Sequence, residues 1–111
     1  MWTYNAKVLR VLDGDTIEAD IDLGFDMHYI AKVRLAGINA PEMKTPQGAP
    51  AKARLTEMLA ITPTVVITTK LNKEFEKYGR VLGDITVMHG NLPVNINQQM
   101  IIEGFAIPMK G

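Results

Sequence analysis

Alternating apolar and polar positions near the start of the chain predict a β-hairpin. Residues 6–12 form the first expected strand, Asp13-Gly14 its turn, and residues 16–22 the returning strand. In the returning strand every second side chain is apolar and the others are polar or acidic, which indicates one buried and one solvated side. A third strand is expected at residues 28–38, and its end is apolar on both faces, which favours a central position.

From residue 50 onward, the hydrophobic pattern takes a helical period. Apolar or small side chains recur at i, i+4, i+7 and i+8 from Ala51, which predicts an amphipathic helix over residues 50–62 that opens at Pro50. Two further strands are expected at residues 64–71 and 81–88, joined by a charged connection.

The last predicted element is a second helix. Asn95 and Gln98 have the spacing of a capping box at its start, and Gly104 ends it. The resulting order is β-β-β-α-β-β-α, with a helix between the third and fourth strands. This order predicts an α+β protein with a five-stranded OB-type barrel, in a single domain over residues 1–111.

Composition excludes several classes of protein. Hydrophobic residues make up 47% of the chain, too many for a disordered protein, and the absence of cysteine excludes disulfides and thiolate chemistry. No apolar run is long enough to span a membrane. The first five residues have neither a basic start nor an apolar stretch, so we expect no signal peptide and favour the cytoplasm.

The net charge is zero, which argues against a protein that coats nucleic acid by bulk charge, but the charges are unevenly distributed. Residues 1–30 hold two basic and six acidic side chains, a balance of −4, and the remainder carries +4. Such a division fits a cation site beside a polyanion site, or a solvated sheet face.

Asp15 has the same strand parity as the apolar side chains of the returning strand. A carboxylate on the inner side of a barrel mouth needs a partner, and a hard cation is a suitable one. The acidic residues of the opposite face are expected to be solvated, with a second cation as the alternative: Glu18, Asp20 and Asp22. His28 and His89 lack the spacing of zinc ligands, so no zinc site is expected.

Arg34 lies within an apolar strand, where an arginine is costly unless it is paired. A buried salt bridge to Glu42 or Asp15 would satisfy it, and so would a bound anion. Residues 76–80, with sequence Glu-Lys-Tyr-Gly-Arg, form either a solvated turn or a basic, aromatic nucleic-acid contact.

Three segments taken together are more specific. Asp-Gly-Asp-Thr at 13–16, Val-Arg-Leu-Ala-Gly-Ile-Asn-Ala-Pro-Glu at 33–42, and Lys-Tyr-Gly-Arg at 77–80 occur in this order. They resemble the staphylococcal nuclease (thermonuclease) family, and in particular its short members. The resemblance extends over about residues 7–109 and implies the same OB-type barrel.

The resemblance implies a role for eight residues. Arg34 and Arg80 would grip the scissile phosphate, and Glu42 would act as general base on a water molecule. The calcium site would use the carboxylate of Asp15, the side chain of Asn39, where the family often has a second aspartate, and the backbone carbonyl of Ala40. Contacts to a neighbouring phosphate would come from Lys77 and Tyr78.

The function implied is that of a divalent-cation-dependent nuclease, most simply calcium-dependent. It would cut single-stranded or breathing DNA or RNA as an endonuclease or exonuclease, leave a 3′-phosphate, and act as a monomer. The alternative is an OB-fold module that binds nucleic acid or protein without cutting. Arg34, Glu42 and Arg80 favour the enzyme, whereas the neutral Asn39 favours the module.

Overall fold

The computed structural model describes residues 2–60, 64–70 and 80–109. Eight strands and two helices lie within these residues. In chain order they are β1 (Thr3–Asp13), β2 (Thr16–Gly24), β3 (Met27–Leu35), β4 (Ile38–Asn39), α1 (Gly48–Ala60), β5 (Thr64–Lys70), β6 (Arg80–His89), β7 (Leu92–Asn95), α3 (Ile96–Ile102) and β8 (Ile107–Pro108). Neither of these helices is both long and apolar enough to cross a lipid bilayer.

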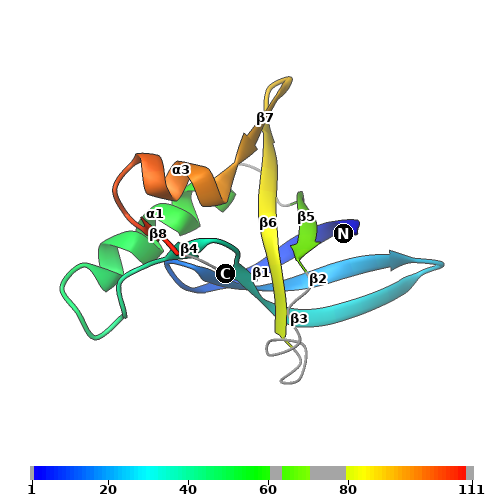
Figure 1. Ribbon diagram of the computed structural model, residues 1–111. Coiled ribbons are helices and arrows are strands. Elements are labelled where there is room, and N and C mark those ends of the chain that lie inside the picture. The colour runs from blue at the N-terminus through cyan, green and yellow to red at the C-terminus, as the bar shows by residue number, and fades with distance from the viewer. Residues whose placement is uncertain (1, 61–63, 71–79, 110–111) are drawn as a thin grey trace.

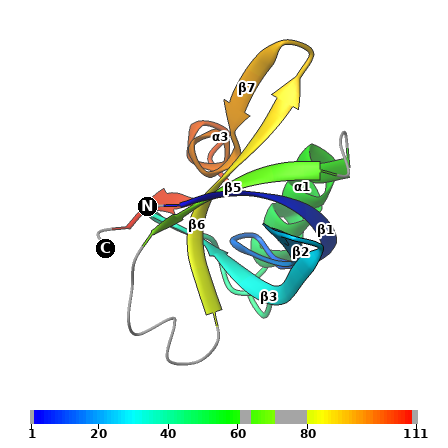
Figure 2. The same ribbon diagram turned by 90° about the vertical axis from the view of Figure 1, so that its right-hand side faces the viewer.

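Five of the strands close into a barrel (Figures 1 and 2). β1 lies between β2 and β5, and pairs antiparallel with both. β3 continues the sheet from β2, and β6 continues it from β5. A parallel pairing of β3 with β6 closes the ring. The OB-type barrel predicted from the element order is confirmed.

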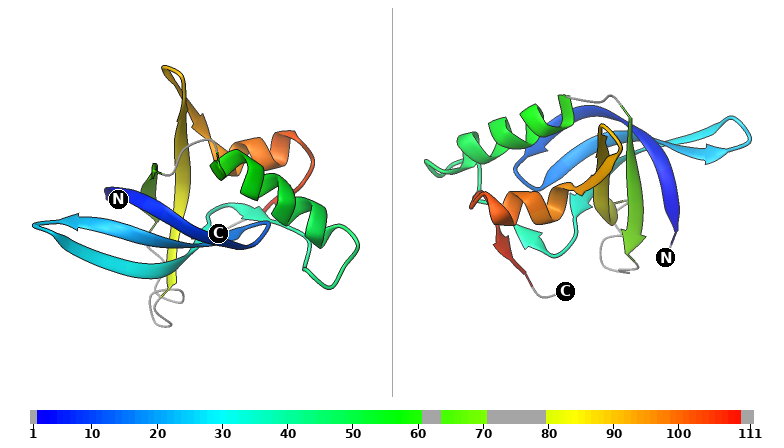
Figure 3. Two further views of the ribbon diagram at one scale, coloured as in Figure 1. Left: turned by 180° about the vertical axis from the view of Figure 1, so that it is seen from behind. Right: turned by 90° about the horizontal axis from the view of Figure 1, so that it is seen from above.

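The barrel core comes from the alternation that predicted the strands. The inward side chains of β2 and β3 are almost fully buried, as are those of β5 and β6: Ile17, Ala19, Ile21, Ala31, Val33, Leu35, Val65, Ile67, Ile85 and Val87. α1 packs against β1, and α3 packs against β6 and β7 (Figure 3). The fully buried apolar side chains that the helices add to this core are Ala51 and Leu55 from α1, and Ile96 and Met100 from α3.

The prediction of one long third strand at residues 28–38 is wrong, because the chain turns at Ala36 and Gly37. β3 ends at Leu35, and β4 pairs instead with β8 near the end of the chain. Ala36 and Ile38 are also buried, so apolar side chains continue through the turn. The hydrophobic pattern therefore did not show where the strand ends.

Two boundaries also differ from expectation. α1 begins two residues before Pro50. Pro50 thus lies in the first turn of the helix, where proline is tolerated because its missing N–H is not needed. β6 ends at His89, and a short turn leads to a further strand that was not predicted, β7, which pairs with the end of β6.

A buried amide fastens α3 to the barrel. Asn97 is 1% exposed, and its Nδ2 donates to the carbonyl oxygens of Ala36 at 2.9 Å and Gly83 at 3.1 Å. Its Oδ1 accepts from Ile85 N at 3.1 Å. The predicted cap is confirmed next to it, since Asn95 Oδ1 accepts from Gln98 N at 3.0 Å. The turn after β3 is therefore held in place by α3.

The β2–β3 hairpin extends past the closed part of the barrel, on the side away from the helices (Figures 1 and 3). Phe25 and Asp26 form its tip, both with positive φ, of 56° and 60°. Phe25 is 98% exposed.

Candidate functional site

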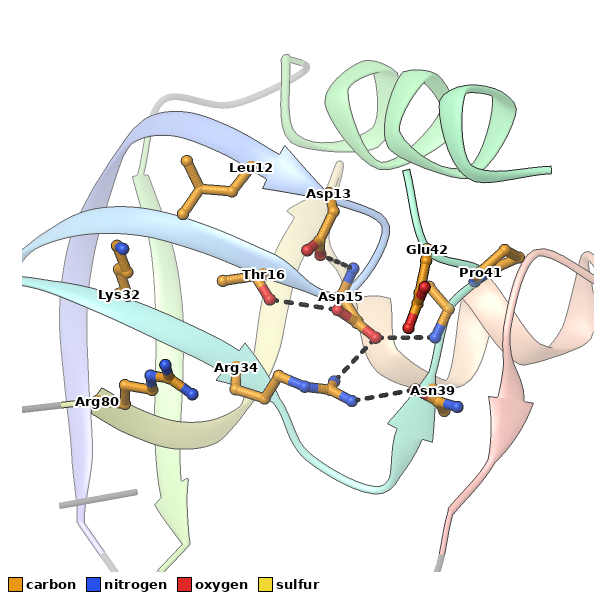
Figure 4. Close-up of a pocket in the computed structure, with 11 residues that line it drawn as sticks. Leu12, Asp13, Asp15, Thr16, Lys32, Arg34, Asn39, Pro41, Glu42 and Arg80 are labelled. Carbon is orange, nitrogen blue, oxygen red and sulfur yellow. Dashed lines mark hydrogen bonds and ion pairs between the residues drawn. The ribbon is translucent and has the colours of Figure 1, made fainter. Parts of the chain in front are cut away.

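A cavity of about 440 Å³ opens at one side of the barrel, beside the β1–β2 turn (Figure 4). It contains all six of the predicted site residues that the structure describes: Asp15, Arg34, Asn39, Ala40, Glu42 and Arg80. Its other lining residues are Leu12, Asp13, Thr16, Lys32 and Pro41. Lys77 and Tyr78, the other two predicted residues, fall outside the described part of the chain.

The closure of the barrel places the basic side chains together. In the parallel pairing of β3 with β6, Lys32 lies opposite Arg80. Arg34 follows Lys32 by two residues, so strand alternation turns it to the same face. Figure 4 shows the side chain of Arg80 pointing toward Arg34. Three cations from two distant segments thus converge on one cavity.

Asp15 is the centre of the hydrogen-bond network. Its Oδ2 accepts from Ala40 N at 2.8 Å and forms an ion pair with Arg34 Nη1 at 3.1 Å. Its Oδ1 accepts from Thr16 Oγ1 at 3.2 Å, and its own N–H donates to Asp13 Oδ1 at 3.0 Å. The salt bridge expected for Arg34 is therefore made with Asp15.

Burial governs the electrostatics of this pair. The Asp15 side chain is 10% exposed and that of Arg34 is 16% exposed. Loss of solvation raises the pKa of Asp15 to about 6, although the Ala40 N–H and Arg34 favour its ionised form. For Asp13 burial also acts to raise the pKa, but the hydrogen bonds to Asp15 outweigh it and lower the pKa.

The ion pair with Asp15 uses only one of the two terminal nitrogens of the Arg34 guanidinium. Nη1 also donates to the Leu35 carbonyl oxygen at 3.1 Å, which anchors that nitrogen to the strand end. Nη2 is 3.5 Å from Asn39 Oδ1, a long contact. The ion pair thus fixes one nitrogen of the guanidinium, while the second faces the cavity beside Asn39 (Figure 4).

Glu42 has a fixed backbone and an exposed side chain at the cavity rim. Its carbonyl oxygen accepts from Thr45 N at 2.9 Å and Thr45 Oγ1 at 2.6 Å. Gly48, at the start of α1, packs against this segment so closely that a Cβ there would lie 2.6 Å from Met43 Cα. The Glu42 side chain is 71% exposed, and its Oε2 lies 3.2 Å from Lys44 Nζ. The carboxylate can therefore reach water.

The β1–β2 turn is packed as tightly as the Glu42 segment. A Cβ on Gly14 would lie 2.7 Å from Ala40 Cβ and 2.8 Å from Ala51 Cβ. Glycine at this position lets the turn that carries Asp13 and Asp15 press against Ala40 and α1 at once. Ala40 can then donate its N–H to Asp15.

The donors around Asp15 fit a hard divalent cation. They are carboxylate and amide oxygens, with no sulfur or imidazole, a set suited to calcium or magnesium. Asp15 Oδ1 accepts only a hydroxyl among the contacts described, and Asn39 Oδ1 makes only the long contact to Arg34. Within the described residues no three His, Cys, Asp or Glu side chains cluster as metal ligands, so water would supply most of the coordination.

The acidic face of β2 is engaged by other groups. Glu18 Oε1 lies 3.4 Å from Arg10 Nε, and Asp20 Oδ1 lies 2.9 Å from His28 Nδ1. Asp22 Oδ1 accepts from Gly24 N at 2.8 Å. These cross-strand and local contacts support the solvated face rather than a second cation.

Two cavity residues were missed by the sequence interpretation. Asp13 was assigned only to the hairpin turn, and Lys32 was assigned no role. The spacing of Lys32 from Arg34 places them on one face of a strand, and this was the available signal for Lys32. For Asp13, its contact with the Asp15 N–H required the folded turn.

Comparison with known proteins identifies the family. The family model described as "Staphylococcal nuclease homologue" matches residues 32–110. A protein named "Micrococcal nuclease" from Shigella flexneri is 35% identical over 111 residues, covering 93% of this chain and 57% of that protein. An Escherichia coli protein named "Uncharacterized endonuclease" is 34% identical over 102 residues, covering 92% of this chain and 59% of the relative. The OB-type barrel is that of the staphylococcal nuclease class. The chain belongs to the family of staphylococcal nuclease homologues.

A third relative has a different name. "Protein ParB" of Escherichia coli is 31% identical over 105 residues, covering 90% of this chain and 54% of that protein. The chain thus spans somewhat more than half the length of each of these three relatives.

Proposed function

We propose that this chain is a divalent-cation-dependent nuclease that hydrolyses phosphodiester bonds of DNA or RNA. The observation that carries the proposal is the cavity itself, where Arg34, Arg80 and Glu42 meet beside the carboxylates of Asp13 and Asp15. Membership of the nuclease family and the names of two relatives support it.

Arg34 and Arg80 are the proposed phosphate ligands. Hydrolysis passes through a state with extra negative charge on the phosphate oxygens, and guanidinium groups stabilise that charge by forked hydrogen bonds. The ion pair with Asp15 orients Arg34 in advance, so that little ordering is left for the reaction. Lys32, on the same face, adds positive potential for a polyanion.

Glu42 is the proposed general base. Its backbone is fixed by Thr45 and by the start of α1, and its carboxylate is open to water at the cavity rim. A carboxylate so placed removes the proton from an attacking water molecule. General bases of this kind contribute roughly 10²–10⁴ in rate.

The residues that would hold the cation are Asp15, Asn39 and Ala40, the last through its carbonyl oxygen. Calcium is the proposed cation because the family resemblance implies it, and oxygen donors are compatible with it. A bound divalent cation supplies positive charge that stabilises the negative charge developing on the phosphate oxygens. The contribution of the chain is to hold Asp15 in position through Ala40 N, Thr16 and Arg34.

Further features follow from the family resemblance and belong to the same proposal. Lys77 and Tyr78 contact a phosphate next to the scissile one. The substrate is a single-stranded or breathing region, and the product carries a 3′-phosphate. We also propose that the active species is a monomer.

The direct test is digestion of a supercoiled plasmid and of a single-stranded oligonucleotide, each with calcium, magnesium or a chelator. Cleavage that requires one of the cations is the expected result. If the oligonucleotide binds but neither substrate is cut with either metal, the chain is a nucleic-acid-binding OB module. The neutral Asn39 is the residue that favours that alternative.

A further inference from the structure

A second cavity, of about 340 Å³, adjoins the candidate site. Arg80 lines both cavities, so they meet at this residue. The second cavity has a different character, since most of its wall is aromatic or aliphatic. Its lining includes Trp2, Tyr4, Leu23, Tyr29 and Lys70. We call it the aromatic hollow.

The hollow exists because three strands continue past the point where the core ends. Ala6, Ile21 and Tyr29 lie in one row across β1, β2 and β3. Ala6 and Ile21 are buried, but Tyr29 is 43% exposed. Tyr4 and Leu23 continue the same inward parity one step further out. Among the described residues, the inner face of the barrel is left open at this end, and neither α1 nor α3 contributes to its wall.

The side chains of Trp2 and Tyr29 are exposed at this opening. Trp2 is 71% exposed, and yet its backbone is fixed to β5. Its N–H donates to Thr69 Oγ1 at 3.2 Å, and its carbonyl oxygen accepts from Thr69 N at 2.8 Å. An exposed indole on a fixed backbone is a flat apolar surface, and only its two side-chain torsions remain to be ordered when it is covered.

The charges of the hollow favour an anionic polymer over an apolar peptide. Its described lining residues include Lys70 and Arg80 and contain no carboxylate. Lys70 lies 3.6 Å from Asp84 Oδ2 and remains 44% exposed. Aromatic faces beside cations are the usual surface for unpaired bases joined by phosphates.

We propose that the aromatic hollow binds one unpaired nucleobase of the substrate strand, stacked on Tyr29 and Trp2. The base belongs to the nucleotide adjoining the phosphate at Arg80. This inference rests on the proposed function, because it takes nucleic acid as the substrate. It also supplies a reason for preferring single strands, since a base within a duplex has no face available for stacking.

The chain contains one tryptophan, so its own fluorescence reports on the hollow. The probe is a single-stranded octathymidylate in calcium, added to the Glu42→Gln variant after a gel shows that the oligonucleotide stays intact. Saturable quenching of Trp2 emission is expected, with the same midpoint as binding measured by anisotropy of a labelled octathymidylate.

Substitutions in the same Glu42→Gln background locate the contact. Tyr29→Ala is expected to weaken binding about tenfold, because it removes the ring on which the base stacks. Tyr29→Phe keeps the ring and is expected to bind within about twofold of the parent. Phe25→Ala is the matched control, because it removes an exposed aromatic from the same hairpin outside the hollow.

An abasic nucleotide gives the second arm of the test. One position in the oligonucleotide is replaced at a time, and one replacement is expected to weaken binding as much as Tyr29→Ala does. That replacement should then have no further effect in the Tyr29→Ala variant, because both changes remove the same contact.

The outcomes separate the two proposals. If the octathymidylate binds tightly without changing Trp2 emission, and the Tyr29→Ala variant binds it as tightly as its parent does, the proposal for the aromatic hollow is overturned. The nuclease proposal then still stands. Quenching that depends on Tyr29, in a chain whose native form cuts nothing, supports the hollow and refutes the nuclease. A dimer in sedimentation velocity that Tyr29→Ala dissociates, without any effect on oligonucleotide binding, overturns the hollow in favour of a second copy of the chain.

Discussion

Asp15 and Arg34 constrain each other at the candidate site. A buried carboxylate or guanidinium alone would be costly, and the ion pair at 3.1 Å offsets part of that cost for both. The same contact decides which way the rest of each side chain faces. Substitutions here therefore affect geometry and charge together, and conservative replacements are the informative ones.

Replacing Glu42 by glutamine tests the proposed base. The side chain is 71% exposed, so the Glu42→Gln variant is expected to keep the fold and to bind oligonucleotide normally. Cleavage should fall by at least ~10², because the amide cannot accept the proton. Initial rates at saturating calcium measure the effect. Glu57→Gln is the matched control, since Glu57 is 69% exposed on α1, and wild-type rates in both variants would remove Glu42 from the mechanism.

Arginine and lysine are expected to differ at position 34. An ammonium cannot contact Asp15 and a phosphate with separate nitrogens, so Arg34→Lys should lose most of the activity, by ~10² or more. Arg10→Lys is the control, because Arg10 is 62% exposed and pairs with Glu18 outside the cavity. Equal losses in the two variants, measured as kcat/KM on a single-stranded substrate, would mean that general positive charge and not a defined contact drives cleavage.

Asn39 sets the charge of the proposed cation site. Asn39→Asp adds a carboxylate beside Asp15, and calcium affinity rises with the number of charged ligands. We expect calcium to bind at least about tenfold more tightly, with a larger rise of Tm on adding calcium. Calorimetric titration and melting curves, in calcium and in chelator, measure both quantities.

The contact of Asn39 Oδ1 with Arg34 at 3.5 Å bears on the metal-free variant, because Arg34 would offset part of the new repulsion between carboxylates. Tm in chelator should therefore change little. Asp15→Asn is the negative control and should bind no calcium. Equal affinities in Asn39→Asp and the parent chain would show that residue 39 does not face the cation.

At the scale of elements, an ion pair fastens α1 to the end of α3. Arg54 Nε donates to Glu103 Oε1 at 2.6 Å, and Arg54 Nη2 donates to Glu103 Oε2 at 3.0 Å. Gln99 Nε2 adds a third hydrogen bond at 2.8 Å. The hydrogen bonds from Arg54 and then Gln99 lower the pKa of Glu103 to about 2.

The lowered pKa of Glu103 predicts how the stability of the fold changes with pH. The folded pKa lies below the ordinary value of 4.5, so the stabilisation is fully present above pH 4.5 and is lost as pH falls toward 2. Glu103→Gln should therefore lower Tm at pH 7, and the difference from the parent should shrink between pH 4.5 and 2. Melting curves at pH 7, 4 and 2.5 test this. A difference that stays constant with pH would show that the carboxylate charge is not its source.

Elements with a regular local pattern were predictable from the sequence, and elements defined by distant partners were not. The hairpin of β1 and β2, the apolar face of α1 and the cap at Asn95 depend on patterns and partners that are close together in the sequence. β4 is two residues long and exists only because β8 pairs with it. The sequence predicted a continuous strand there, since nothing in residues 28–38 records that pairing.

The candidate site divides in the same way. The motifs around Asp15, Arg34 and Glu42 marked the residues that line the cavity. The choice of Asp15 over Glu42 as partner of Arg34 depended on where the β1–β2 turn lies against Ala40. The position of Lys32 in the cavity depended on the register between β3 and β6. Lys77 and Tyr78 remain predictions from the resemblance.

At the scale of the whole molecule, the parallel pairing of β3 with β6 has a consequence for folding. It joins segments far apart in the sequence, and closing so long a loop is entropically unfavourable and slow. The hairpins and helices rely on nearer partners, but Arg34 and Arg80 share a face only once this pairing forms. A refolding chain can therefore regain much of its circular dichroism signal before the two proposed phosphate ligands lie together. If the chain cleaves nucleic acid as proposed, recovered cleavage would report the β3–β6 pairing itself, which spectroscopy of helices and hairpins does not.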